Sequence, residues 1–179
     1  INVYGVDYIE EKIGDLKLKL NSASFFQVNT KQCKTLYENI NSSILKNSTV
    51  LDAHCGVGSI SSFVAGKAAD IIGVDNNYEA INLAKINQKM NNLDHLKFYK
   101  SNIGDILPLL KSNKSIDTII LDPPRSGCEL SLLNELKDNE FKEKNLKKDN
   151  IKEDNFKIII YVSCNKNSLS RDLNTLSKH

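Results

Sequence analysis

The residues Thr49–Ser59, with the sequence TVLDAHCGVGS, allow the fold of this chain to be predicted. They begin with β-branched and aliphatic residues and pass through a turn containing Gly56 and Gly58 to a helix start at Ser59. A strand, a glycine turn and a helix start in this order direct backbone N–H groups and the positive end of a helix toward a ligand. The stretch therefore predicts a ligand site at the end of a sheet strand, with a tight turn that binds nothing as the alternative.

Short apolar runs alternate with amphipathic stretches along most of the chain. Strands are predicted at 49–53, 71–75, 96–99, 117–121 and 157–162, and helices at 31–45, 59–66, 77–90, 130–137 and 167–177. This alternation is typical of an α/β domain with a mainly parallel sheet and helices on both faces. Leu16–Leu20 alternates leucine and lysine, which predicts a hairpin strand. We therefore expect an N-terminal β-hairpin segment, residues 1–21, followed by one domain, residues 22–179.

The composition excludes several classes of protein. The 179 residues carry 24 basic and 22 acidic side chains, so a nucleic-acid binder that works by bulk positive charge is not expected. No apolar run approaches the roughly 18 residues of a membrane helix. The four cysteines form no C-x-x-C pair, so we predict neither a metal site nor a disulfide framework. We expect a cytoplasmic monomer. The charged stretch 138–155 is predicted to be a mobile insertion.

Polar residues follow the second and third predicted strands. Asp75 closes the second strand, where its carboxylate can accept hydrogen bonds from ribose hydroxyls. Dinucleotide folds carry G-x-G-x-x-G, but position 61 is a serine here, so the pattern is more similar to the S-adenosylmethionine-binding fold than to an NAD-binding one. Asn102 lies where such folds contact adenine. Capping of the following helix explains Asn102 equally well, and the nearby Ser101 and Asp105 compete for the adenine contact.

Two further segments lie at the predicted carboxyl ends of strands. The segment Asp122-Pro123-Pro124-Arg125 follows the fourth strand. Methyltransferases that act on exocyclic amines usually have an aromatic residue where Arg125 stands, so Arg125 argues against amine methylation. Cys164 follows the fifth strand, between serine and asparagine and before a helix start, an arrangement that favours a thiolate. Of the other cysteines, we predict that Cys33 and Cys128 belong to the core and that Cys55, the rival nucleophile, packs beneath the glycine turn.

Taken together, four motifs resemble those of the RNA uracil-5-methyltransferases, enzymes that make 5-methyluridine in ribosomal or transfer RNA. The motifs are Ser24–Asn29, Asp52–Gly58, Asp122–Arg125 and Tyr161–Asn165, and residues 169–173 extend the match. The resemblance implies a Rossmann-like catalytic domain that uses S-adenosyl-L-methionine and acts on RNA. Residues 26–29 favour a ribosomal substrate over transfer RNA.

The resemblance also implies roles for individual residues. Cys164 would be the catalytic nucleophile that attacks carbon 6 of a uridine flipped out of its stack. Gln27 and Asp122 would hold the cofactor and the flipped base. The remaining residues implied to line the cofactor site are His54, Gly56, Asp75 and Asn102. His54 departs from the family, in which a plain aromatic residue is more common, so stacking rather than imidazole chemistry is implied.

A second departure concerns the general base. The family uses a glutamate well beyond the cysteine motif, whereas 15 residues follow Cys164 here and none of them is glutamate. We therefore expect the chain to be part of a longer protein, without the family's base and its amino-terminal RNA-binding domain, and to turn over poorly by itself. The alternatives are a methyltransferase for an exocyclic amine of an RNA base, or a catalytically incomplete fragment that binds S-adenosylmethionine or RNA.

Overall fold

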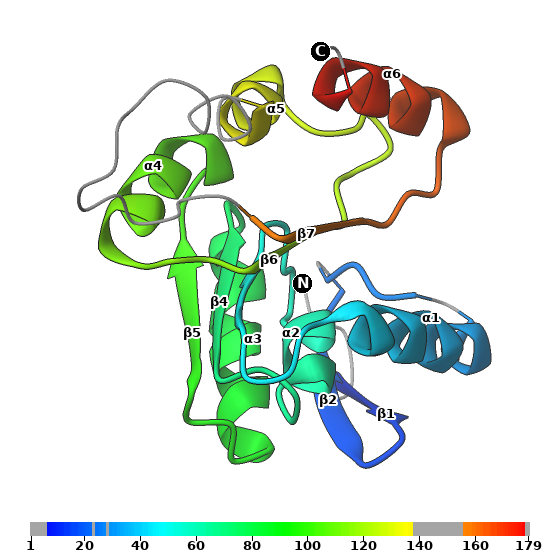
Figure 1. Ribbon diagram of the computed structural model, residues 1–179. Coiled ribbons are helices and arrows are strands. Elements are labelled where there is room, and N and C mark those ends of the chain that lie inside the picture. Colours follow the sequence, from blue (N-terminus) through cyan, green and yellow to red (C-terminus); the bar gives the residue numbers. More distant parts are fainter. Residues whose placement is uncertain (1–6, 23, 28, 138–155, 178–179) are drawn as a thin grey trace.

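The computed structural model describes residues 7–22, 24–27, 29–137 and 156–177 (Figure 1). Its strands are β1 (Ile9–Ile13), β2 (Leu16–Leu20), β3 (Thr49–Asp52), β4 (Asp70–Asp75), β5 (Leu96–Lys100), β6 (Thr118–Leu121) and β7 (Ile158–Tyr161). Its helices are α1 (Thr30–Ser43), α2 (Ser59–Val64), α3 (Tyr78–Met90), α4 (Ile103–Asn113), α5 (Leu130–Lys137) and α6 (Lys166–Leu176). The predicted mobile insertion at 138–155 lies outside the described residues.

The main sheet has five parallel strands in the order β5-β4-β3-β6-β7. The chain builds outward from β3 to β5, then crosses back to place β6 on the other side of β3. In open α/β sheets, ligands bind at the carboxyl ends of the strands beside such a reversal, here between β3 and β6. The mainly parallel sheet and the antiparallel β1–β2 hairpin, in which Ile9 pairs with Leu20 and Ile13 with Leu16, confirm the predicted fold.

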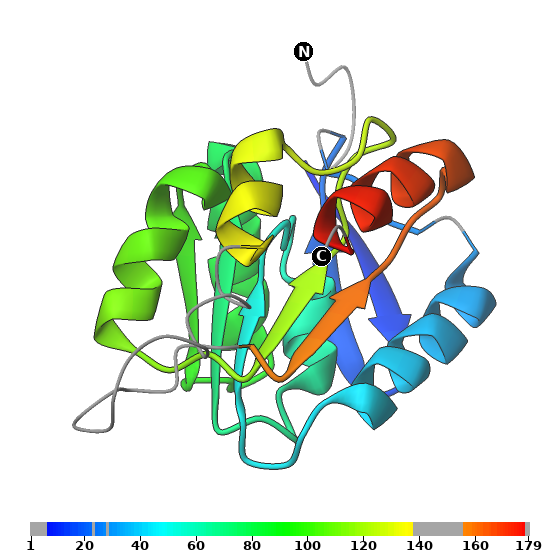
Figure 2. The ribbon, with the colours of Figure 1, turned by 45° about the horizontal axis from the view of Figure 1, so that its top comes forward.

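Helices cover both faces of this sheet. Val50 packs in one apolar cluster with the hairpin and α1–α3, while its neighbour Leu51 packs in a second cluster with α4 and α5. Figures 1 and 2 show these two groups of helices on opposite sides of the sheet, with α6 beside α5. Burial on both faces explains why the strands are continuously apolar in sequence. Among the described residues, no helix has the length and apolar content needed to cross a membrane.

Two asparagines on α3 attach the hairpin to the domain. Asn87 accepts a hydrogen bond from the Lys19 N–H at 2.7 Å and donates to the Lys19 carbonyl at 3.2 Å. Asn91, one turn later, bonds the N–H and carbonyl of Lys17 at 3.0 and 2.7 Å. The two amide side chains therefore hydrogen-bond to backbone groups of β2 in the way that a neighbouring strand would. Asn87 also donates to the Val57 carbonyl at 3.1 Å, which connects the hairpin to the glycine turn.

The ends of the predicted elements differ from the observed ones by at most two residues. The predicted helix 31–45 is Thr30–Ser43, and the predicted helix 59–66 ends at Val64. Helix α4 follows Asn102, whose side chain makes no capping hydrogen bond, and continues through Pro108. Ile103 and Leu107 are buried on one face of α4, so apolar packing of this face maintains the helix despite the missing proline N–H.

Candidate active site

Three carboxylates lie at the carboxyl ends of the central strands. Asp52 ends β3, Asp75 ends β4 and Asp122 follows β6. Asp52 is fully buried: its Oδ2 accepts a hydrogen bond from the Ser61 hydroxyl at 2.6 Å, while its Oδ1 has no partner in the described part of the chain. Ser61 thus occupies the position of the last glycine in the dinucleotide pattern and fixes Asp52 instead, a role that the sequence did not predict.

Burial suppresses the ionisation of two of these groups. The pKa of Asp52 is raised to about 7, mainly because the carboxyl is buried and further because Asp122 is nearby, although the hydrogen bond from Ser61 opposes the change. Burial also raises the pKa of Asp122 to about 6. Carboxyl groups of this kind ionise more readily beside a cation, so this edge of the sheet suits a positively charged ligand.

The two glycines of the turn have different roles. Gly56 has φ +52°, and a Cβ added there would meet nothing within 4 Å, so the space over its backbone is open. The Gly56 N–H donates to Asp75 Oδ2 at 2.9 Å, which joins the turn to the end of β4. At Gly58, with φ +76°, a Cβ would lie 2.7 Å from the Phe98 ring. Gly58 therefore permits core packing, whereas Gly56 leaves its backbone accessible to a ligand.

The other predicted cofactor residues come from separate parts of the chain and differ in setting. His54 directly precedes Cys55 in the turn, and its Nδ1 is buried without a hydrogen-bond partner among the described residues. Burial lowers the pKa of His54, which favours the neutral ring. Asn102 is the N-cap residue of α4, but its side chain makes no capping hydrogen bond. Gln27 lies half-buried between β2 and α1. Their contacts with a cofactor stay predictions.

The four cysteines, all within the described residues, fall into two classes. Cys33, Cys55 and Cys128 are buried, as predicted, and burial raises the pKa of each thiol. Cys164 is exposed. Buried thiols with raised pKa values are poor nucleophiles at neutral pH, so Cys164 is the thiol that is available for chemistry.

Cys164 lies in a tight turn directly before α6. The Ser163 hydroxyl accepts a hydrogen bond from the Asn165 N–H at 3.1 Å, and the Asn165 side chain caps α6 by accepting from the Asn167 N–H at 3.0 Å. The last sheet hydrogen bond, from the Val162 N–H to the Leu121 carbonyl, spans 2.7 Å. Asp122 and Cys164 therefore follow neighbouring strands at the same edge of the sheet, beside the positive end of a helix.

This parallel sheet, with its glycine turn after β3 and its acidic residue at the end of β4, defines a Rossmann-like S-adenosylmethionine-dependent methyltransferase domain. The chain belongs to the family described as "Methyltransferase domain", whose model matches residues 44–173.

Relatives and solved structures extend this comparison. A protein from Bacillus cereus strain ATCC 10987 named "Uncharacterized RNA methyltransferase" is 38% identical over an alignment of 179 positions, which covers 98% of this chain and 36% of the relative. The Pyrococcus abyssi tRNA (uracil-54, C5)-methyltransferase in complex with S-adenosyl-L-homocysteine is 26% identical with a TM-score of 0.74, over 97% of this chain and 39% of that chain. The chain thus spans about a third of the length of the curated relatives it matches.

A second structural similarity shows the fold alone. The Methanocaldococcus jannaschii tRNA m1G37 methyltransferase is 22% identical with a TM-score of 0.57, over 70% of this chain and 36% of that chain.

The residues present fit S-adenosyl-L-methionine, the cofactor of this fold. The open backbone at Gly56 leaves room for a ligand, and the carboxyl groups of Asp52 and Asp122 suit one that carries positive charge. Asp75 accepts hydrogen bonds from the Gly56 N–H and the Asn77 N–H, and its contact with ribose hydroxyls stays a prediction. When bound, the cofactor supplies a methyl group on a positively charged sulfur. The described residues contain no group of three or more His, Cys, Asp or Glu side chains that could hold a metal ion.

The two glycines provide a test of the cofactor site. Gly56→Ala is expected to weaken S-adenosyl-L-methionine binding by at least about tenfold with a stability loss of only about 1 kcal/mol, because its Cβ enters open space at a positive φ. Gly58→Ala is expected to cost about 2–4 kcal/mol of stability, because its Cβ collides with Phe98. Calorimetric titration and urea unfolding measure the two effects.

Gly66→Ala, at an open site without positive φ, is the control and should change neither the affinity nor the stability. Wild-type affinity in Gly56→Ala would contradict the assignment of the cofactor site.

Proposed function

We propose that this domain methylates carbon 5 of uridine in RNA through a covalent adduct between Cys164 and carbon 6. The observation that carries the proposal is the exposed thiol of Cys164, beyond the end of β7 and at the same sheet edge as Asp122 and the Gly56 turn. The resemblance of four motifs to the uracil-5-methyltransferases supports it. So do the relatives named as RNA methyltransferases and the similarity to the archaeal tRNA (uracil-54, C5)-methyltransferase.

The proposed chemistry explains why a thiol is needed. Carbon 5 of uracil is a weak nucleophile, so it must be activated before it can accept a methyl group. The thiolate of Cys164 adds to carbon 6 and forms a carbon–sulfur bond, while the electrons of the 5,6 double bond move into an enolate with carbanion character at carbon 5. After methylation, a base removes the proton from carbon 5. The electrons of that bond restore the double bond and expel the Cys164 thiolate.

Other residues of the chain have roles in holding the base. The uridine must leave its stack before a thiol can approach carbon 6. Asp122, with a pKa raised to about 6 by burial, is mostly ionised at neutral pH and can accept a hydrogen bond from the N–H donor of a uracil edge. We propose that Asp122 and Gln27 contact the flipped base. His54, Gly56, Asp75 and Asn102 contact the cofactor.

Methylation of an exocyclic amine is the competing reaction. Enzymes of that class usually carry an aromatic ring after the two prolines, where this chain has the exposed Arg125. The similarity to the m1G37 methyltransferase extends to the fold and no further. The presence of an exposed thiol at the sheet edge favours the carbon-5 reaction, because methylation of an amine needs no covalent activation of the base.

Product analysis tests the proposal. The full-length polypeptide is incubated with S-adenosyl-L-methionine and unmodified ribosomal or transfer RNA labelled with tritium at carbon 5 of uridine. Formation of 5-methyluridine, seen by nucleoside mass spectrometry, with release of one tritium per methyl group is the expected result. Methylated guanosine or adenosine without tritium release would overturn the proposal. Comparison of the two RNAs also tests the ribosomal preference predicted from residues 26–29.

A further inference from the structure

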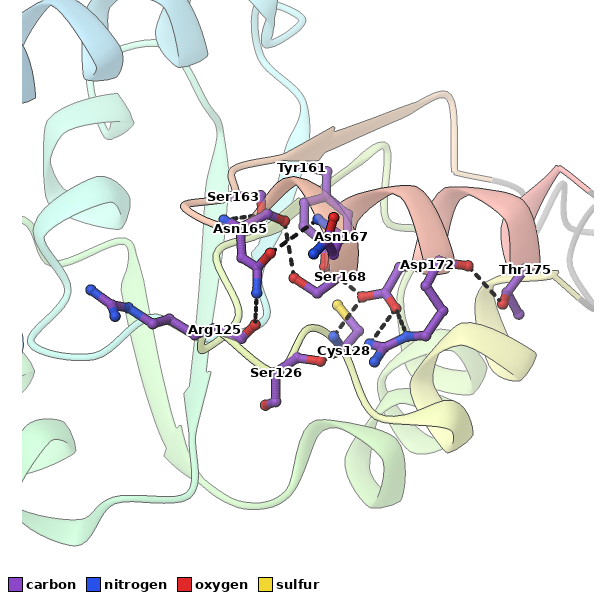
Figure 3. A network of polar contacts seen from close by, with 11 residues as sticks. Arg125, Ser126, Cys128, Tyr161, Ser163, Asn165, Asn167, Ser168, Asp172 and Thr175 are labelled. Atoms are coloured by element: carbon purple, nitrogen blue, oxygen red, sulfur yellow. Dashed lines mark hydrogen bonds and ion pairs between the residues drawn. The ribbon is translucent and has the colours of Figure 1, made fainter.

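Asp172, on α6, is a fully buried carboxylate that joins three segments of the chain (Figure 3). Its Oδ2 accepts hydrogen bonds from the Tyr161 hydroxyl at 2.6 Å and from the Cys128 N–H at 2.7 Å. Its Oδ1 accepts from Nε and Nη2 of Arg171 at 2.9 and 2.6 Å. The end of β7, the loop after β6 and helix α6 therefore meet at this one side chain.

Two neighbouring contacts hold the same loop. Nη2 of Arg171 also donates to the Ser126 carbonyl at 2.7 Å, and Nδ2 of Asn165 donates to the Arg125 carbonyl at 3.1 Å. Together with the Cys128 N–H, three backbone groups of the loop 122–128 are bonded to residues 165–172. The loop that begins with Asp122 is thus fixed to the segment that directly follows Cys164.

The close approach of the loop depends on Gly127. Its φ is +86°, and a Cβ there would lie 2.5 Å from Asp172 Oδ2 and closer still to Arg171 Nη2. A side chain at this position would force the loop away from α6. Because Gly127 has no side chain, backbone groups of the loop can reach the buried charge of Asp172. A bulkier residue at position 127 would block this approach.

The hydrogen bonds keep Asp172 charged in spite of its burial. Burial by itself would raise the pKa of Asp172, but the bonds from Tyr161, the Cys128 N–H and Arg171 outweigh it, so the pKa lies below its usual value. A buried charge with four donors resists displacement, because each lost bond leaves the charge less well compensated. The network therefore acts as a stiff link between the segments that it joins.

We propose that Asp172 is a positioning residue, which sets the placement of Asp122 relative to Cys164; this inference rests on the proposed function. The parallel register aligns Leu121 with Tyr161, but the sheet hydrogen bonding ends at Val162. Beyond it, both chain segments are irregular, and the contacts around Asp172 fix their relative position. A base bound between a contact residue and a nucleophile requires this placement to be accurate, since an error of about 1 Å can cost on the order of 100-fold in rate.

The test uses Asp172→Asn in the full-length polypeptide, with RNA that contains 5-fluorouridine at saturating S-adenosyl-L-methionine. Fluorine at carbon 5 prevents the final proton removal, so the Cys164 adduct accumulates and can be counted on a denaturing gel. The first-order rate of adduct formation at saturating RNA is expected to fall by on the order of 10- to 100-fold. The affinity for S-adenosyl-L-methionine is expected to stay unchanged, because Gly56 lies in the turn after β3 and Asp75 lies at the end of β4, away from the contacts of Asp172.

Two further variants make the result specific. Arg171→Met removes two of the four bonds to Asp172 and the bond to Ser126, while the Tyr161 hydroxyl and the Cys128 N–H still donate to the buried carboxylate, and we expect a smaller loss of rate than in Asp172→Asn. Thr175→Val lies on the same helix and loses only a bond from its hydroxyl to the Arg171 carbonyl, so it should react at the wild-type rate.

The possible failures are distinguishable. A normal adduct in the wild type, together with wild-type rates in Asp172→Asn and Arg171→Met, would overturn the inference alone. A loss of rate that matches the loss of folded protein or of cofactor affinity would overturn it as well, because it would show a general structural role. A wild type that methylates RNA without any Cys164 adduct would overturn the proposed function and the inference with it.

Discussion

Replacement of Cys164 with alanine is expected to reduce uridine methylation by on the order of 10⁴-fold or more. Without the thiolate, carbon 5 keeps the low nucleophilicity of free uracil, and the rest of the site supplies only binding and orientation. Affinity for S-adenosyl-L-methionine is expected to stay within about twofold, because the cofactor turn lies between β3 and α2, whereas Cys164 follows β7. Methyl incorporation into RNA and calorimetric titration measure the two quantities on the same preparation.

A second cysteine supplies the control for this experiment. Cys33 is buried in α1, where burial raises the pKa of its thiol, so Cys33→Ala should retain activity with a modest loss of stability. Cys164→Ser is the conservative variant, and its hydroxyl is too weakly acidic to replace the thiolate. Survival of carbon-5 methylation in both Cys164 variants would show that the reaction proceeds without this nucleophile.

The parallel sheet was predictable because its strands are buried on both faces. Ile119, Ile120 and Leu121 are fully buried, and such continuous apolar runs separated by amphipathic helices indicate a covered parallel sheet. The hairpin was predictable for the opposite reason, since Leu16, Leu18 and Leu20 are buried while Lys17 between them is exposed. Both patterns depend on residues that are close together in the chain, and for this reason they can be recognised in a single sequence.

The polar contacts that shape the site were not predictable, because they join residues far apart in the chain. Asn87 bonds a strand 68 residues away, and Asp172 bonds an N–H 44 residues away. Neither contact has a periodic signal. On α6, Ser168 and Asp172, four residues apart, place two polar side chains on the buried face of the helix, and in the sequence residues 169–173 only extend the motif match. The sequence placed Asn102 between a strand and a helix, but its side chain makes no capping hydrogen bond. No local pattern distinguishes an asparagine that caps a helix from one that contacts a cofactor.

The contribution of Asp52 to the free energy of unfolding is expected to fall as the pH rises from about 4 to about 7. The pKa of Asp52 is raised by burial to about 7 in the folded chain, against an ordinary value of 3.8. Below that ordinary value both states hold the proton, and the full stability is present. Between the two values the unfolded state has lost the proton while the folded state retains it, so stability decreases by about 4 kcal/mol, and it levels off above the folded pKa.

Asp52→Asn should remove this component, because an amide keeps the shape of the protonated acid and its oxygen still accepts from Ser61. Relative to wild type, we expect the variant to gain about 4 kcal/mol between pH 4 and pH 8 in urea unfolding, in the absence of cofactor. Asp122→Asn is the matched variant, and it should remove only a smaller component that is complete near pH 6. Parallel pH profiles for Asp52→Asn and wild type would contradict the raised pKa. A more stable variant that binds the cofactor less well would show that the carboxyl is maintained for the ligand at the expense of the fold.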